Sequence, residues 1–293
     1  MKPAEFEERE YEAPLYNQLE RGSPNVWAPG LVFEGHIGLD RGLFILDPWI
    51  FRLHGYASYP PGAALSRYRW PAAWFARQSP RRLPGFRLNL FIQAKRPVWG
   101  QRPPAAVRTR GVTGRFWRFA IDKQQHAALG AVAAKLRARA LVVYACAAFH
   151  EHSQLFAHTC RGTIAANSTF PSVLSLSGHD AWYYNKPGAT GVANPDPTAI
   201  EEPSLDARIV GLLEGEIAAS DSWRLDLDIL ARNIHDALAE ETLVATSRVA
   251  AFFDLLRRIQ RETEDLEERS ALSSFLTVAA FSEVFLVNWY VVG

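Results

Sequence analysis

The amino-acid sequence predicts an α/β fold with a mainly helical C-terminal region. Residues 141–147 are a continuous apolar run of the kind found in a fully buried strand, and residues 87–95 read as a strand that is apolar on one side. Between them, residues 123–137 place Leu129, Val132 and Leu136 on one face of a helix. A strand, a helix and a strand at this spacing form a crossover unit, which is typical of α/β domains. From Leu205 onward the apolar spacing is helical.

We expect two domains, residues 1–195 and 196–293. Residues 13–21 read as a short first helix, with Pro14 in its first turn and Gly22 as its stop. Strands are expected at residues 31–40 and 44–46. Two segments rich in proline and arginine, residues 55–86 and 96–118, read as basic surface insertions, and loops of that length are usually functional.

Charge is balanced overall at +1 but is unevenly distributed along the chain. No Asp or Glu occurs from Pro48 to Ile121, whereas Asp196 to Glu241 is strongly acidic. The basic stretch carries Arg52, Arg67, Arg69, Arg77, Arg81, Arg82, Arg87, Lys95, Arg96, Arg102, Arg108, Arg110, Arg115 and Arg118. Aromatic residues are interleaved with these cations, so a nucleic acid is the favoured partner. The alternative is that the basic stretch docks on the acidic one within the chain.

The composition favours a reducing compartment without membrane insertion. Two cysteines, Cys146 and Cys160, do not make a disulfide framework, and the Glu-rich start does not resemble a signal peptide. The apolar stretch from Phe275 to Val292 contains Glu283, so a buried helix or strand is expected there rather than a span. We therefore expect a cytoplasmic protein.

The residues that point to chemistry lie at the end of the expected strand 87–95. Because side chains alternate along a strand, Asn89, Phe91, Gln93 and Lys95 share one face. Asp40 ends an earlier apolar segment. An Asp, the Gln93 carbonyl and the Ala94 backbone carbonyl are oxygen donors suited to a divalent ion, with Lys95 beside a scissile phosphate.

This arrangement resembles the PD-(D/E)xK nuclease superfamily, in its Gln-x-Lys variant, over roughly residues 8–150. The resemblance implies a restriction-endonuclease-like mixed central sheet flanked by helices. It also implies that Asp40 matches the family's Asp, that Gln93 and Lys95 match its strand pair, and that Glu12 matches the acid of its first helix. Glu8 and Glu10 are alternatives for that acid. The chain departs from the family pattern in having Leu39 before Asp40 and Gln93 where an acid is commoner.

Two further residues are candidates for the same site. Glu34 falls on the same face as Asp40 if residues 31–40 form a regular strand, and it would serve as a secondary acid or pair with an arginine. Gln125 opens the helix 123–137 and would reach the site, as a helix glutamine does in some superfamily members, or lie at the surface.

The function implied by the resemblance is metal-dependent endonucleolytic hydrolysis of DNA in restriction or antiviral (anti-phage) defence, with RNA left open. Glu12, Asp40 and Gln93 would hold Mg²⁺ or Mn²⁺, and Lys95 would assist the attacking water. The C-terminal helices would serve a homo-oligomer or a partner protein. The alternative function is a catalytically inactive nucleic-acid-binding subunit of a larger defence or repair complex. A serine hydrolase built on Ser175 and His179 has little support, since the Gly-x-Ser-x-Gly elbow is missing.

Overall fold

A computed structural model describes residues 1–19, 26–27, 42–43, 88–215, 222–240, 243, 246–262 and 269–292. The chain divides into two compact units, Met1–Leu15 with Pro84–Gly293, and Tyr16–Leu83. In the second unit, β2 (Val26–Trp27) pairs antiparallel with β3 (Gly42–Leu43). The expected strand positions 31–40 and 44–46, and with them Glu34 and Asp40, lie outside the described residues, as does the insertion 55–86.

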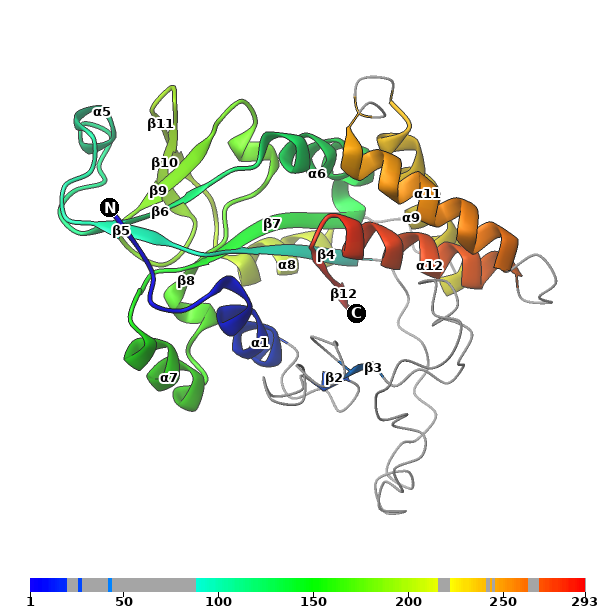
Figure 1. The fold of residues 1–293 in the computed structure, drawn as a ribbon, viewed down its shortest axis with the longest axis horizontal. Coiled ribbons are helices and arrows are strands. Elements are labelled where there is room, and N and C mark those ends of the chain that lie inside the picture. Colours follow the sequence, from blue (N-terminus) through cyan, green and yellow to red (C-terminus); the bar gives the residue numbers. More distant parts are fainter. Residues whose placement is uncertain are drawn as a thin grey trace, which may run out of the picture. The chain divides into compact units, whose positions relative to one another are not determined.

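The first unit contains a four-stranded mixed sheet in the order β12-β4-β7-β8. Strand β4 (Leu88–Lys95) runs parallel to β7 (Ala140–Ala147), and α6 (Lys123–Leu136) connects them, which confirms the predicted crossover unit. Strands β12 (Asn288–Val292) and β8 (Ser168–Thr169) pair antiparallel with β4 and β7. Figure 1 shows α6 and the start of α1 (Glu8–Leu19) on opposite sides of β4 and β7. Strand β4 is buried up to Ala94, including the polar Asn89 and Gln93, whereas the sequence predicted a strand that is apolar on one side only.

A second sheet of six antiparallel strands follows the order β1-β5-β6-β9-β10-β11. Its strands are β1 (Lys2–Pro3), β5 (Val98–Gly100), β6 (Phe116–Ala120), β9 (Ala181–Tyr184), β10 (Thr190–Asn194) and β11 (Thr198–Glu201). Gly191 in β10 is required by packing, because a Cβ there would lie 2.5 Å from the Trp182 ring. The segment 96–118, expected as a surface insertion, contains β5, the short α5 (Ala105–Arg108) and the start of β6, and its two strands pair with each other.

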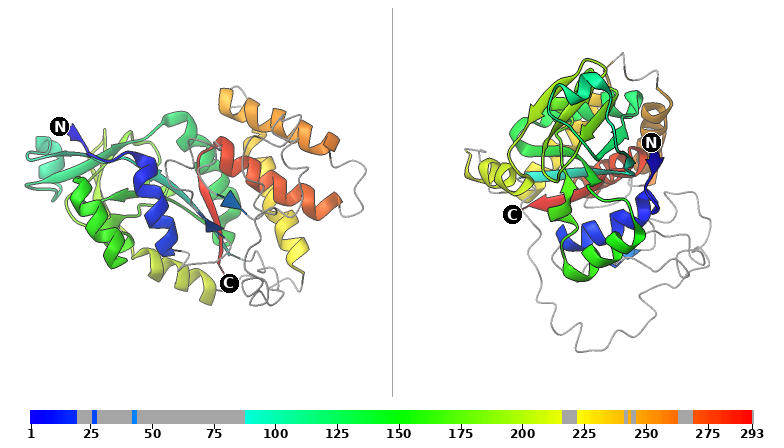
Figure 2. Two further views of the ribbon diagram at one scale, coloured as in Figure 1. Left: turned by 60° about the horizontal axis from the view of Figure 1, so that its bottom comes forward. Right: turned by 90° about the vertical axis from the view of Figure 1, so that its left-hand side faces the viewer.

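The predicted helical C-terminal region is confirmed from residue 205 onward. It contains α8 (Leu205–Glu214), α9 (Trp223–Leu238), α11 (Ser247–Glu262) and α12 (Arg269–Val284). Helices α9, α11 and α12 pack together beside α6 (Figure 2). The expected domain boundary at 195/196 falls between the paired strands β10 and β11, inside one compact unit. Among the described helices, none is both long and apolar enough to cross a bilayer.

The first helix begins earlier than the sequence analysis expected. It starts at Glu8, so Pro14 lies inside it rather than in its first turn. Glu8 and Glu10 sit in the first turn, where acidic side chains interact favourably with the helix dipole. Tyr11 and Leu15 are fully buried one turn apart. This packing offsets the hydrogen bond that an internal proline removes.

Candidate active site at the end of β4

The carboxyl end of β4 presents Gln93 and Lys95 on one face of the sheet. Strand β12 begins opposite Ile92, so Gln93, Ala94 and Lys95 extend beyond its ladder. Gln93 is 2% exposed, and its Oε1 has no hydrogen-bond partner among the described residues. Leaving a buried acceptor without a partner costs about 1–3 kcal/mol. A position that keeps such an atom in the interior is a candidate for binding a ligand.

Lys95 is held in a half-buried position between α6 and β7. Its Nζ donates a hydrogen bond to Gln125 Oε1 over 3.3 Å and lies 5.6 Å from the centre of the Tyr144 ring. Burial lowers the pKa of Lys95, while the negative charges of Glu8 and Asp122 raise it. The lysine is therefore a partly desolvated cation with acidic groups nearby.

Glu8 is the acid of the first helix that the structure brings to Lys95. Its Oε2 accepts a hydrogen bond from the Arg96 backbone N–H over 3.2 Å, one residue beyond the lysine. Burial raises the pKa of Glu8, and the positive charge of Lys95 opposes that rise. Glu8 and Lys95 therefore influence each other's charge state.

The other two candidate acids of α1 differ from Glu8 in their surroundings. Glu10 accepts hydrogen bonds from the Glu7 backbone N–H at 2.7 Å and from His152 at 3.2 Å, so it belongs to the contact between α1 and α7 (His152–Arg161). Glu12, the acid that the sequence favoured, lies one turn after Glu8 and is half-buried. Burial raises the pKa of Tyr11, and the charge of Glu12 adds a smaller contribution in the same direction.

Gln125 reaches the site, which is one of the two positions that the sequence left open; the other was the surface. It is 2% exposed, and its side chain lies between Lys95 and the end of α12. Its Oε1 accepts from Lys95, and its Nε2 donates to the Phe285 carbonyl over 2.5 Å. This second contact comes from the C-terminal region and has no sequence signal, because it uses a backbone carbonyl.

The donor types at this end of β4 suit a hard divalent cation. The Glu8 carboxylate and the unpartnered Gln93 amide oxygen are oxygen ligands of the kind that Mg²⁺ and Mn²⁺ prefer. Across the described ranges, no cluster of three His, Cys, Asp or Glu side chains gathers. This end of β4 therefore has oxygen donors close to the Lys95 ammonium. A complete set of ligands for a divalent metal ion requires further groups.

The basic segment 96–118 is largely solvent-exposed. Arg102, Arg108, Arg110 and Arg115 are exposed, while Arg96 pairs with Glu7 over 2.8 Å. In the part of the chain that the structure describes, no ion pair joins this segment to the acids of residues 196–241. The side chains of these four arginines are open to solvent.

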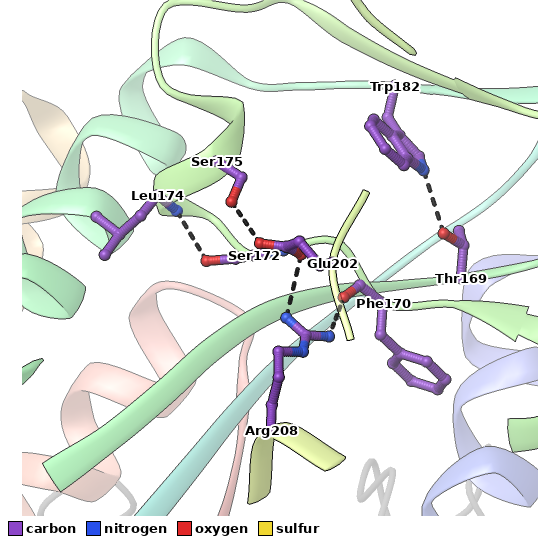
Figure 3. A network of polar contacts seen from close by, with 8 residues as sticks. All are labelled: Thr169, Phe170, Ser172, Leu174, Ser175, Trp182, Glu202 and Arg208. Atoms are coloured by element: carbon purple, nitrogen blue, oxygen red, sulfur yellow. Dashed lines mark hydrogen bonds and ion pairs between the residues drawn. The ribbon is translucent and has the colours of Figure 1, made fainter. Parts of the chain in front are cut away.

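A second polar cluster surrounds Glu202 and Arg208 (Figure 3). Arg208 donates to Glu202 over 3.2 Å and to the Phe170 carbonyl, and Glu202 also accepts from the Ser172 backbone N–H over 2.8 Å. The Ser175 hydroxyl donates to Glu202 rather than to a histidine, so it is not arranged as a nucleophile. This cluster fixes the start of α8 against the loop that follows β8.

Comparisons of the chain with models of protein families, with curated proteins and with solved structures found no match.

Proposed function

We propose that this chain is a metal-dependent nuclease that hydrolyses DNA phosphodiester bonds. Two observations at the end of β4 carry the proposal: Lys95 donates to Gln125 of α6, and the Gln93 oxygen two residues earlier has no partner among the described residues. Glu8, which accepts from the Arg96 backbone N–H, is near enough for its charge to raise the pKa of Lys95. Oxygen donors next to a half-buried lysine are the parts that phosphodiester hydrolysis needs. The setting in restriction or anti-phage defence, and the cytoplasmic location, rest on the resemblance and on the sequence.

Each residue has a role in this proposal. Glu8 and Gln93 would contribute oxygen ligands to Mg²⁺ or Mn²⁺, together with Asp40, which lies outside the described residues. The bound ion would lower the pKa of a coordinated water and offset charge on the phosphate. Lys95 would orient that water or stabilise the charge that develops on the phosphate oxygens. Gln125 would hold the Lys95 ammonium in place through its hydrogen bond.

One observation favours the second candidate, a catalytically inactive nucleic-acid-binding subunit. Gln93 carries no charge where the family commonly has an acid, so the site would bind an ion more weakly. In that case the exposed arginines of residues 102–115 would still bind DNA, with an affinity that falls steeply as salt rises.

Plasmid cleavage by the purified chain with Mg²⁺ or Mn²⁺ tests the proposal. Lys95→Met and Asp40→Ala should abolish cleavage, whereas Lys135→Met, the same change at an exposed lysine of α6, should leave it intact. Cleavage by both site variants at the parent rate would refute the proposal. A parent protein that binds DNA but does not cut it with either metal would favour the inactive subunit.

A further inference from the structure

A row of side chains crosses the six-stranded sheet immediately beyond the candidate site. Lys2, Trp99, Trp117 and Tyr184 are directly opposite one another on β1, β5, β6 and β9. Directly opposed residues of antiparallel strands place their side chains on the same face. We call these four residues the aromatic row.

The rings of the aromatic row are held in fixed positions. His150 lies against Trp99 with ring centres 4.0 Å apart, and Trp117 stacks on Tyr184 at 6.0 Å. Tyr184 is fully buried and donates to the Ala147 carbonyl over 2.6 Å. Burial falls along the row, because Trp117 and Trp99 are half-buried and Lys2 is exposed. The row therefore begins in the core and ends at the surface with a tryptophan and a cation.

Charges of both signs surround the exposed end of the row. The segment 96–118 contains no acid and contributes exposed arginines. Burial lowers the pKa of His150, the charges of Glu151 and Glu5 raise it, and the charge of Arg115 lowers it. Several acids of this region form contacts within the protein. Glu5 accepts from the His152 backbone N–H over 3.0 Å, Glu151 caps α7, and Glu7 pairs with Arg96.

A short connection joins the row to the candidate site. Trp99 follows Lys95 by four positions, and β1 fixes the intervening residues. The Ala4 backbone N–H donates to the Pro97 carbonyl over 2.8 Å, and Arg96 donates to the Ala4 carbonyl over 2.6 Å. Trp99 is thus held by β1 at a position four residues after Lys95 in the chain.

We propose that the aromatic row binds an unpaired stretch of DNA beside the scissile phosphate, so that the substrate carries a single-stranded portion. The inference rests on the proposed nuclease function for its biological meaning. Unpaired bases would stack on Trp99 and Trp117, and Lys2 and Arg115 would contact the phosphates. Bases within a duplex are already stacked on one another, so the row discriminates against fully paired DNA.

Fluorescence anisotropy with the Lys95→Met protein in EDTA tests this binding separately from cleavage. The probes are a labelled oligo-dT strand and a blunt duplex of equal length. Trp99→Leu should weaken oligo-dT binding by about 5- to 150-fold, the range found for loss of one stacked base. Duplex binding should stay within about twofold, since its backbone contacts would be unchanged.

Two variants keep the test decisive. Trp99→Phe retains an aromatic face and should recover most of the oligo-dT affinity, whereas Phe156→Leu, at a 72% exposed position on α7, should not change it. Equal affinity of Trp99→Leu and parent for oligo-dT, or an equal loss for both probes, would overturn the aromatic row as a single-strand site. Failure of cleavage with normal strand-selective binding would instead count against the proposed nuclease alone.

Discussion

Replacing Glu8 by glutamine separates a functional role of this carboxylate from a structural one. Glu8→Gln keeps an acceptor oxygen for the Arg96 backbone N–H, which the carboxylate now contacts at 3.2 Å. Hydrogen bonds to charged groups contribute about 1 kcal/mol more than neutral ones, so the exchange weakens this bond by about that amount. Burial disfavours the charged form of Glu8 and raises its pKa, and a neutral side chain avoids that cost. The two effects oppose each other.

We therefore expect Glu8→Gln to change the free energy of unfolding by less than about 1 kcal/mol, a thermal shift of a few degrees at most. Its cleavage rate at limiting Mg²⁺ should fall by about 100-fold or more, since loss of groups that merely support metal ligands already costs about 10- to 100-fold. Higher Mn²⁺ should recover part of that loss.

The assay pairs plasmid cleavage over a metal titration with thermal unfolding. Glu10→Gln is the matched control, because Glu10 contacts α7 and not Lys95. Glu12→Gln, one helical turn away, decides between the two acids of α1. The reasoning is refuted if Glu8→Gln cleaves at the parent rate, or if its activity falls only in proportion to the fraction unfolded.

Three other outcomes follow from the same contacts. Gln93→Leu removes the unpartnered buried oxygen, so it should raise stability by about 1–3 kcal/mol in urea unfolding while lowering cleavage; a destabilised variant would contradict the burial argument. The rate should follow a bell-shaped pH profile, since burial raises the pKa of Glu8 and lowers that of Lys95. In Glu8→Gln the negative charge that raises the pKa of Lys95 is lost, so the alkaline limb of the profile should move to lower pH. An alkaline limb at the parent pH would show that Glu8 does not influence the pKa of Lys95. Arg139→Met leaves Asp226, whose side chain is 3% exposed, without its 2.8 Å partner, and should cost about 3 kcal/mol in urea unfolding, whereas Arg137→Met is the neighbouring control.

The sequence predicted the crossover unit because its signals are local. Each of its three segments has a sequence pattern that predicts its own secondary structure: a strand, an amphipathic helix and a second strand. A helix that joins two neighbouring parallel strands packs on their sheet in one preferred way, which is the right-handed crossover. The helix opening at Lys123 is capped by Asp122, whose carboxylate accepts from the Gln125 backbone N–H. That cap also fixes Gln125 at the start of α6, so the reach of its side chain toward the strand end was predictable in outline.

Pairings between distant segments were not predictable in this way. Strand β12 pairs with β4 although about two hundred residues separate them. The two strands of the segment 96–118 were not predicted, because its proline and arginine content is typical of a loop. The choice of Glu12 over Glu8 rested on spacing from Leu15 and Leu19. Residues four apart share a helix face, so spacing alone does not distinguish them. The start of α1 at Glu8, set by tertiary packing of Tyr11, decides which acid meets Arg96.

The C-terminal region contributes directly to the surroundings of Lys95. Gln125 can hold the lysine only while its amide is oriented, and the Phe285 carbonyl sets that orientation by accepting from Nε2. Asn89 adds a second connection, since its side chain donates to the Arg139 carbonyl and accepts from Trp289 of β12. Any movement of the end of α12 would therefore free Gln125 to rotate and would withdraw the acceptor from the Lys95 ammonium. A partner that binds the C-terminal helices would thus have a short physical route to the proposed chemistry, through one glutamine side chain.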